Sequence, residues 1–156
     1  MKMKIFTFKV ILVLLIGNIN AQTFTVTKNS ANKALMSYLE NNNISNEKDK
    51  VFQTSQLKIG DLNNDKKPDA VVRYILGPKK GNVVTGSGIV VFINTGDSLK
   101  FVTNYQEEPN AVLKSIVNGI IFIEKLMYAQ DDPRCCPSIK SKSGLMLIDN
   151  KLSEIN

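Results

Sequence analysis

The chain has 156 residues, with 20 lysines and arginines against 14 acidic residues and no histidine or tryptophan. The absence of histidine excludes Ser-His-Asp and Cys-His catalytic arrangements and a His-ligated zinc site. This length predicts one domain with a real hydrophobic core, and the sequence shows no internal repeat and no sign of a second domain.

The first 21 residues have the pattern of a secretory signal. Lysines at positions 2, 4 and 9 precede the apolar run Val10–Ile16, and Ala21 offers a small residue for cleavage before Gln22. The alternative is a membrane anchor, but this run is shorter than the roughly 20 residues that span a bilayer. We therefore expect residues 1–21 to be a signal peptide and residues 22–156 to form a single β-rich domain. The mature protein would be secreted or periplasmic, with no membrane span.

Removal of the leader lowers the net charge of the protein. The leader holds 3 of the 20 basic residues and none of the 14 acids, so the mature chain has 17 basic and 14 acidic residues, or +3. The lysine pairs at 66–67 and 79–80 are isolated and are not interleaved with aromatic residues. This pattern is typical of a solvated surface, so nucleic acid is not an expected partner.

The first elements predicted in the mature chain are a short strand over Thr23–Val26 and a helix from Ser30. In the helix, Ser30 is expected to be the N-cap and the asparagines at 41–43 end the element. Helical spacing places five side chains on one face: Ala31, Ala34, Leu35, Tyr38 and Leu39. This is the only helix that the sequence predicts.

After Val51 the sequence predicts strands and turns. The expected strands are 51–59, 70–76, 89–94, 99–105, 111–117, 120–128, 144–149 and 152–155. Gly77–Gly88 is expected to be a long, glycine-rich connection. Lys140–Ser143 is interpreted as alternating residues on a strand that form a polar edge.

One pair of strands is predicted to form a hairpin. Asn118-Gly119 accepts the positive φ values of a type I′ turn, which sets Val117 opposite Ile120 and Ile116 opposite Ile121. Both faces of this hairpin are apolar near the turn, so each needs a cover. We therefore predict an α+β, mainly β fold: an antiparallel meander or small sandwich with one N-terminal helix.

The densest cluster of ligand-type side chains is the loop GDLNNDKKPDAVV, residues 60–72. Asp61, Asn63, Asp65 and Asp69 occupy its positions one, three, five and nine, a spacing that aims several oxygens at one hard cation such as Ca²⁺. Three carboxylates this close repel one another without a cation. The alternative is an Asx-rich loop with no ion, because Asp and Asn also cap their own backbone.

This loop resembles the calcium loop of FG-GAP and VCBS repeats, Asp-x-Asn-x-Asp-Gly-x-x-Asp running into a strand. The resemblance implies a structural Ca²⁺ held by the side chains of Asp61, Asn63, Asp65 and Asp69 and by the backbone carbonyl of Lys67. It does not extend beyond the loop, and the chain is too short for the propellers of that family. Lys66 replaces the family's glycine, and Val72 stands where an EF-hand has its bidentate glutamate.

The two cysteines, Cys135 and Cys136, are adjacent. In an oxidising compartment they can form a vicinal disulfide, remain free thiols or form intermolecular bridges. Adjacent Cα atoms are ~3.8 Å apart, below the usual disulfide window of about 4.4–6.8 Å, so a vicinal bond would hold a strained, rigid turn. The segment also resembles an Asp-Pro-x-Cys-Cys-Pro-Ser element of small secreted bacterial proteins, which implies no activity.

The sequence contains no recognisable catalytic constellation. We expect an exported, calcium-stabilised binding or accessory domain without catalytic activity, whose partner is a protein or small ligand outside the cytoplasm. The alternative is a small inhibitor or immunity-type protein that blocks a hydrolase through a loop. A third interpretation is a hydrolase with a carboxylate pair drawn from Glu107, Glu108, Glu124, Asp131 and Asp132.

Two loops form the predicted contact surface, Gly77–Gly88 and Asp131–Ser138. Tyr128 and Arg134 are the expected anchors, because tyrosine and arginine are common at interfaces. An exposed anchor on either loop would favour the inhibitor, and a concave pocket would favour a small ligand.

Overall fold

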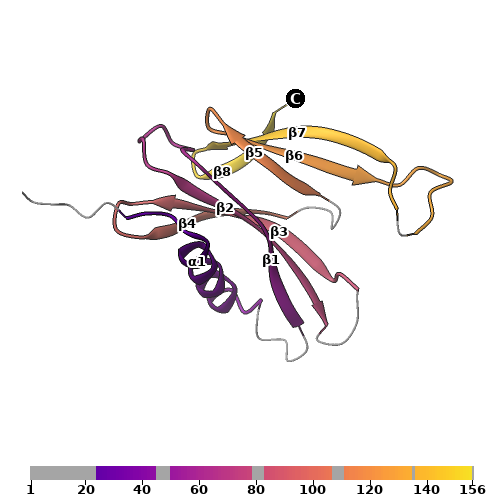
Figure 1. Cartoon of the computed structure of the whole chain (residues 1–156), viewed down its shortest axis with the longest axis horizontal. Helices are drawn as coiled ribbons and strands as arrows, with labels where there is room; N and C mark the ends of the chain where they lie inside the picture. The colour runs from indigo at the N-terminus through magenta and orange to yellow at the C-terminus, as the bar shows by residue number, and fades with distance from the viewer. Residues whose placement is uncertain (1–23, 45–49, 79–82, 107–110, 135, 156) are drawn as a thin grey trace, which may run out of the picture.

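The computed structural model describes residues 24–44, 50–78, 83–106, 111–134 and 136–155, with side chains except those of residues 50–55. These ranges contain one helix, α1 (Lys28–Asn41), and two antiparallel four-stranded sheets (Figure 1). The first sheet is formed in chain order by β1 (Lys50–Gly60), β2 (Asp69–Pro78), β3 (Gly86–Asn94) and β4 (Leu99–Gln106). The second is formed by β5 (Val112–Val117), β6 (Ile120–Met127), β7 (Ile139–Ile148) and β8 (Lys151–Ile155). The predicted mainly β fold with a single helix is confirmed.

The two central strands of the first sheet, β2 and β3, are buried on both faces. Successive strand residues point to opposite sides of a sheet. On β2, Ala70, Val72 and Tyr74 belong to the apolar cluster that contains α1. Val71 points the other way and belongs to the cluster formed with the second sheet. The helix contributes Ala31, Leu35, Tyr38 and Leu39 to its cluster. The second sheet contributes Leu113, Ile121, Ile123 and Leu145 to the other. The molecule thus has two cores, one on each side of the first sheet (Figure 1).

The helix begins three residues earlier than predicted. Thr27, not Ser30, is the N-cap: the Thr27 hydroxyl accepts a hydrogen bond from the Ser30 amide at 3.1 Å. The Ser30 hydroxyl in turn accepts one from the Thr27 amide at 2.8 Å. Either residue type can cap a helix, and this reciprocal capping box uses both of them. The end of the helix at Asn41, with Asn42 as C-cap, agrees with the prediction.

The predicted strand over Thr23–Val26 is wrong for residues 24–26, which have no regular secondary structure; Thr23 lies outside the described residues. The Phe24 amide donates to the Gly96 carbonyl at 3.2 Å, and Val26 is buried in the helix-side core. The segment is therefore apolar because it packs beneath the helix, and its backbone pairs with a turn instead of a strand.

The glycine-rich connection Gly77–Gly88 is shorter than predicted, because its two ends belong to strands. Leu76 pairs with Gly86 and Tyr74 with Gly88. A Cβ atom at Gly88 would lie 2.9 Å from the Tyr74 ring. Glycine is needed here because an aromatic side chain lies across the strand, a reason that sequence position alone does not reveal.

The predicted β5–β6 hairpin is confirmed with its register, Val117 opposite Ile120 and Ile116 opposite Ile121. Asn118 and Gly119 have φ values of 51° and 77°. A second two-residue turn, Asp149-Asn150, joins β7 and β8 with φ values of 50° and 60°. β7 begins at Ile139 instead of Gly144, because Lys140–Ser143 pair with β6 and so become part of the sheet.

Contacts of β1 and β4 with the second sheet also join the two sheets. A Cβ atom at Gly60 of β1 would lie 2.8 Å from the Ile116 side chain of β5, so glycine permits this close approach. The Leu113 amide donates to the Gln56 side-chain oxygen, and the Tyr105 hydroxyl lies 3.5 Å from Glu154 on β8. In the described part of the chain, no helix has the length and apolar character needed to cross a membrane.

Candidate functional site

The acidic loop connects β1 and β2, and the pairing of Gly60 with Asp69 brings its ends together. Asn64 and Lys66 both adopt left-handed backbone conformations, with φ values of 60° and 66°. Asparagine tolerates this conformation better than lysine does. Lys66 therefore accepts the strained position that glycine fills in the loops that this segment resembles.

Inside the loop, the predicted ligand side chains accept hydrogen bonds from loop amides. Asp61 Oδ2 accepts from the Lys66 amide and Asp65 Oδ1 from the Lys67 amide, both at 2.8 Å. Asp61 Oδ1 and Asn63 Oδ1 each accept an amide two residues further on at 3.2 Å. These bonds shape the turn and are also what an ion-free Asx loop would use.

Asp69 anchors the loop to the body of the protein. It is fully buried, and its two carboxylate oxygens accept from the Leu62 and Asn94 amides at 2.8 Å each. Burial is the main cause of its raised pKa; the two amide bonds oppose this rise, and the charges of Asp65 and Asp61 add to it. The Asn94 side chain also donates to the Pro68 carbonyl at 3.1 Å.

The donor set of the loop fits a hard cation in its chemistry. All four predicted side-chain ligands lie in one short loop, and a carboxylate oxygen that accepts one amide keeps further acceptor capacity. The Lys67 ammonium lies 3.9 Å from Asp65 Oδ2, so a cation would compete with it there. In the described ranges no three His, Cys, Asp or Glu side chains already converge as a metal-ligand group. Both interpretations of the loop, with and without an ion, therefore remain open.

The β6–β7 loop is held from within by one carboxylate. Asp132 Oδ2 accepts hydrogen bonds from the Ala129 and Ser138 amides, each at 2.7 Å, which ties together the two ends of the loop. These bonds lower the Asp132 pKa, with the Ala129 amide as the largest cause. The Tyr128 hydroxyl donates to the Arg134 carbonyl at 2.6 Å. The structure thus brings together the two predicted anchors, and it gives Tyr128 a role in the loop itself.

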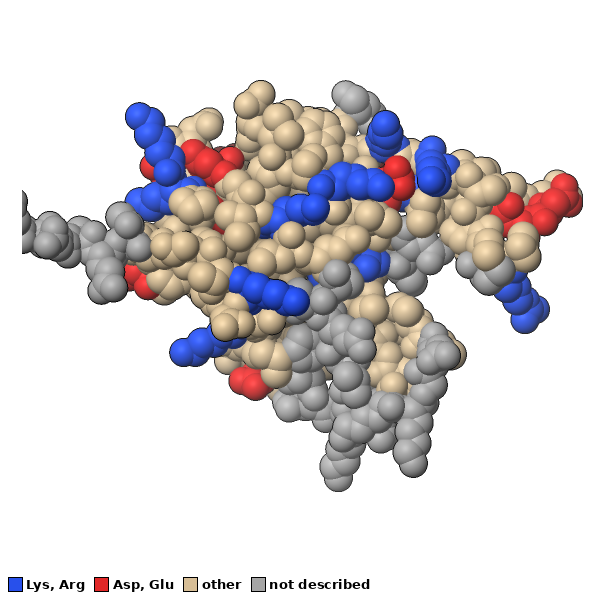
Figure 2. Space-filling view, in the orientation of Figure 1, with Lys and Arg blue, Asp and Glu red and all other residues tan. Residues whose placement is uncertain are grey.

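The same loop projects from the molecule at the end of the long β6–β7 hairpin (Figure 1). Tyr128 is 48% exposed, and the paired residues Met127 and Ile139 are 47% and 44% exposed. Arg134 is also exposed. Acidic and basic side chains both lie at this end of the molecule (Figure 2). Apolar and charged side chains are therefore exposed to solvent on a loop whose two ends are fixed.

The cysteine pair is next to these anchors. The described residues include no free cysteine, and the Cys136 amide donates to the Pro133 carbonyl at 2.9 Å. Cys135 lies outside the described residues, so the vicinal disulfide stays a prediction.

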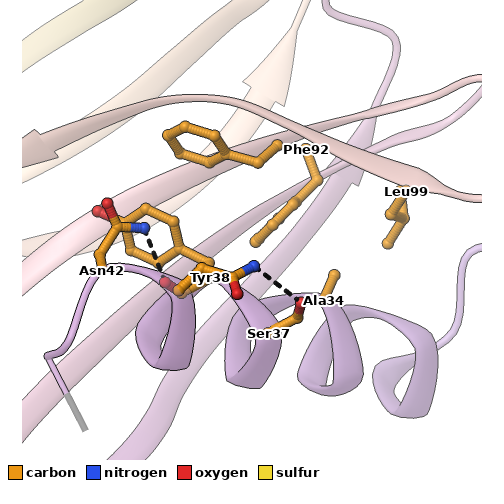
Figure 3. Close-up of a pocket in the computed structure, with 8 residues that line it drawn as sticks. Ala34, Ser37, Tyr38, Asn42, Phe92 and Leu99 are labelled. Carbon is orange, nitrogen blue, oxygen red and sulfur yellow. Dashed lines mark hydrogen bonds between the residues drawn. The ribbon is translucent and has the colours of Figure 1, made fainter. Parts of the chain in front are cut away.

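A hollow that the sequence did not predict lies between α1 and the first sheet (Figure 3). Its volume is about 200 Å³, and the Tyr38 and Phe101 rings stack beside it with centroids 4.7 Å apart. On the helix side, Asn42 donates to the Tyr38 carbonyl at 2.8 Å. No charged side chain lines it; the lining is Ala34, Ser37, Tyr38, Asn41, Asn42, Phe92, Leu99 and Phe101. Only the packing of a helix against two strands brings these residues together.

Two of the acids from which the sequence draws a carboxylate pair, Glu124 and Asp132, have lowered pKa values. Glu124 forms an ion pair with Lys114 at 3.0 Å, and this bond lowers the Glu124 pKa. The Asp132 pKa is also lowered, whereas a general acid at neutral pH needs a raised one. Glu107 and Glu108 lie outside the described residues.

No model of a known protein family matches the chain, and neither a curated protein sequence nor a solved structure is significantly similar to it.

Proposed function

We propose that this protein is an exported, calcium-stabilised binding or accessory domain that contacts a partner protein through the β6–β7 loop. The observation that carries the proposal is that this loop projects from the body, has both ends fixed by Asp132, and exposes Tyr128 and Arg134. A loop that is ordered before binding loses less conformational entropy on association. The two sheets, packed as a small sandwich, would serve as its rigid support.

Export and calcium binding rest on the sequence pattern and on the chemistry of the acidic loop. The leader pattern at residues 1–21 supports passage to a compartment where calcium is abundant. The charges of Asp61 and Asp65 both disfavour ionisation of the buried Asp69, and a bound cation would remove that repulsion. Extracellular modules often bind Ca²⁺ at about 10⁻⁴–10⁻³ M.

The second candidate function is a small inhibitor or immunity-type protein that blocks a hydrolase. The same exposed anchors favour it, since an inhibitor inserts a rigid loop into an active site. The hollow beside α1 favours a small ligand less strongly, because its volume of about 200 Å³ is below the usual range of about 300–1,000 Å³ for ligand sites.

Calcium binding is tested by thermal unfolding of the mature domain in Ca²⁺ and in chelator. At a Ca²⁺ concentration ten times the Kd, linkage predicts about 1.4 kcal/mol of added stability, a rise of several degrees in Tm. Asp65→Ala should abolish this rise, and Asp97→Ala, an exposed carboxylate in the β3–β4 turn, should preserve it. Identical melting curves with and without Ca²⁺ would exclude a bound ion.

Partner binding is tested by affinity purification from the exported proteins of the native cell, with the mature domain as bait. Arg134→Ala should lose the specific partner and keep the Tm of the wild type, because the Arg134 side chain is exposed. Lys33→Ala on α1 is the matched control and should retain the partner. Turnover of a cell-wall, peptide or ester substrate that Asp131→Asn abolishes would instead establish a hydrolase.

A further inference from the structure

The second sheet has one covered face and one face without a cover among the described residues. Its inner side chains pack on the first sheet, with Ile121, Ile123 and Leu145 almost fully buried. The intervening residues point the other way, because side chains alternate along a strand. The strand register places eight apolar residues on this outer face: Val112, Val117, Ile120, Phe122, Leu126, Met146, Ile148 and Ile155.

Six of these side chains are neighbours across or along the strands and form an apolar strip: Val117, Ile120, Phe122, Met146, Ile148 and Ile155. Val117 is 50% exposed, Phe122 38% and Ile148 47%. At the centre, a Cβ atom on Gly144 would lie 2.8 Å from Ile155 and 3.1 Å from Ile120, so these two side chains close over the glycine. Contiguous apolar surface of this kind marks an interaction site more often than scattered exposed residues do.

Lysine side chains surround the strip. Glu124 lies on the same face, where its carboxylate pairs with Lys114 at 3.0 Å and faces Lys142 across the strands. Lys140 is the next lysine on the outer side of β7, and Lys151 pairs with Ile148 at the other end. Four lysines against one glutamate give the outer face a net charge of +3.

The first sheet shows how this protein covers an equivalent face. Central side chains of that face, such as Val72 and Val90, are buried beneath α1, whose Ala31, Leu35 and Leu39 have no exposed surface. One amphipathic helix therefore buries the centre of a four-stranded antiparallel meander in this fold. The second sheet is also a four-stranded meander, and it has no such helix in the described part of the chain.

We propose that the outer face of the second sheet docks an amphipathic helix of a partner protein, with apolar residues on one side and acidic residues flanking them. The apolar side covers the strip around Phe122, and the acids pair with the surrounding lysines. A second copy of this chain is a poorer occupant, because it would bring another face of net charge +3 against this one. The surface is separate from the β6–β7 loop and does not depend on it.

The test is an NMR titration of the ¹⁵N-labelled mature domain with two synthetic helical peptides. Both have a leucine face; one is flanked by glutamates and the other by lysines. The glutamate peptide should bind and shift amide signals of β5–β8 selectively. Its affinity should fall as the salt concentration is raised. The lysine peptide should bind at least tenfold more weakly.

Variants then locate the bound peptide. Phe122→Ser should lower the affinity for the glutamate peptide at least tenfold. Val83→Ser, which changes a 68% exposed valine outside the second sheet, should leave this affinity unchanged. Val117→Ser, at the exposed end of the strip, repeats the test if Phe122→Ser fails to fold. Arg134→Ala should bind the peptide as the wild type does, which separates this surface from the proposed loop function.

Four results would overturn the proposal: binding of neither peptide, equal binding of both, concentration-dependent dimers that Phe122→Ser disrupts, or sedimentation with vesicles of anionic lipid in place of peptide binding. The third result would assign the face to a second copy of the chain. The fourth would assign it to a membrane surface.

Discussion

Two aspartates, Asp69 and Asp132, each accept hydrogen bonds from two backbone amides and so fix the acidic loop and the β6–β7 loop. Asp69 ties the acidic loop to β3 through the Leu62 and Asn94 amides, and Asp132 closes the β6–β7 loop through the Ala129 and Ser138 amides. The amide bonds favour the charged form of both carboxylates, but burial outweighs them at Asp69 and raises its pKa. Both loops are thus organised by single side chains that also belong to acidic clusters in the sequence.

The Asp132 contact predicts a pH dependence for the β6–β7 loop. The folded pKa of Asp132 is lowered by its amide bonds, so their stabilising effect is fully present above the ordinary aspartate pKa and is lost as pH falls through the lowered value. The Ala129 and Ser138 amide signals should therefore titrate together, with a midpoint below that of an ordinary aspartate. Asp132→Asn should remove this shared titration; separate midpoints for the two amides would contradict the bridge.

At the scale of elements, short-range hydrogen bonds set where α1 begins and cross-strand contacts set how far β3 extends. Thr27 and Ser30 cap the helix reciprocally, and the glycines of β3 lie opposite large side chains of β2. In both cases the sequence contains residue types that suit the position: capping residues at the start of the helix and glycines in β3. Which of them caps the helix or permits a close contact depends on the residue that it contacts.

The N-cap assignment predicts different effects at the two capping residues. Thr27→Ala should lower the free energy of unfolding by about 1 kcal/mol, because it leaves the Ser30 amide without its side-chain acceptor. Ser30→Ala should lower it less, since Ser30 is inside the helix, where alanine has the higher propensity. Chemical denaturation of both variants checks this order, and a larger loss for Ser30→Ala would restore Ser30 as the cap.

The β3 glycines predict a second contrast. Gly88→Ala should destabilise the domain by about 1–3 kcal/mol, an ordinary penalty for overpacking, because its methyl group would lie 2.9 Å from the Tyr74 ring. Gly86→Ala is the matched control on the same strand: its methyl group would meet only the end of the Leu76 side chain at 3.3 Å. Thermal melts should show the larger loss for Gly88→Ala, and equal losses would mean that the Tyr74 contact is unimportant.

At the scale of the whole molecule, the first sheet holds the structure together because its central strands, β2 and β3, are buried on both faces. One face packs on α1 and the other on the second sheet, with central residues of β2 and β3 shared between the two cores. Among the described residues, the second sheet has one such contact: its inner face packs on the first sheet, and apolar side chains of its outer face are exposed.

This shared packing predicts that the two sheets unfold together. Leu145→Ala, on the second sheet, should lower the free energy of unfolding by about 2–5 kcal/mol, and amide signals of β2 and β6 should disappear at the same denaturant concentration. Met36→Ala, at a 38% exposed helix position, should have little effect. Separate midpoints for the two sheets would show that each is an independent unit.

The amino-acid sequence by itself determined the fold class, the β5–β6 hairpin with its register, and the position of the acidic loop. These features depend on neighbouring residues: the apolar pattern of a strand, the positive φ values that Asn118-Gly119 accepts, and the short spacing from Asp61 to Asp69. The helix was also predicted correctly, although its cap was misplaced by three residues.

Only the tertiary structure decided which residues serve the rest of the fold. Gly77–Gly88 resembles a loop in the sequence and Lys140–Ser143 a polar edge, yet pairing with β2 and β6 draws part of the first segment and all of the second into the sheets. The hollow beside α1 and the outer face of the second sheet likewise combine residues that are distant in the chain. Local pattern cannot predict such features, because the free energy that forms them comes from contacts between elements and not from the residues next to them in sequence.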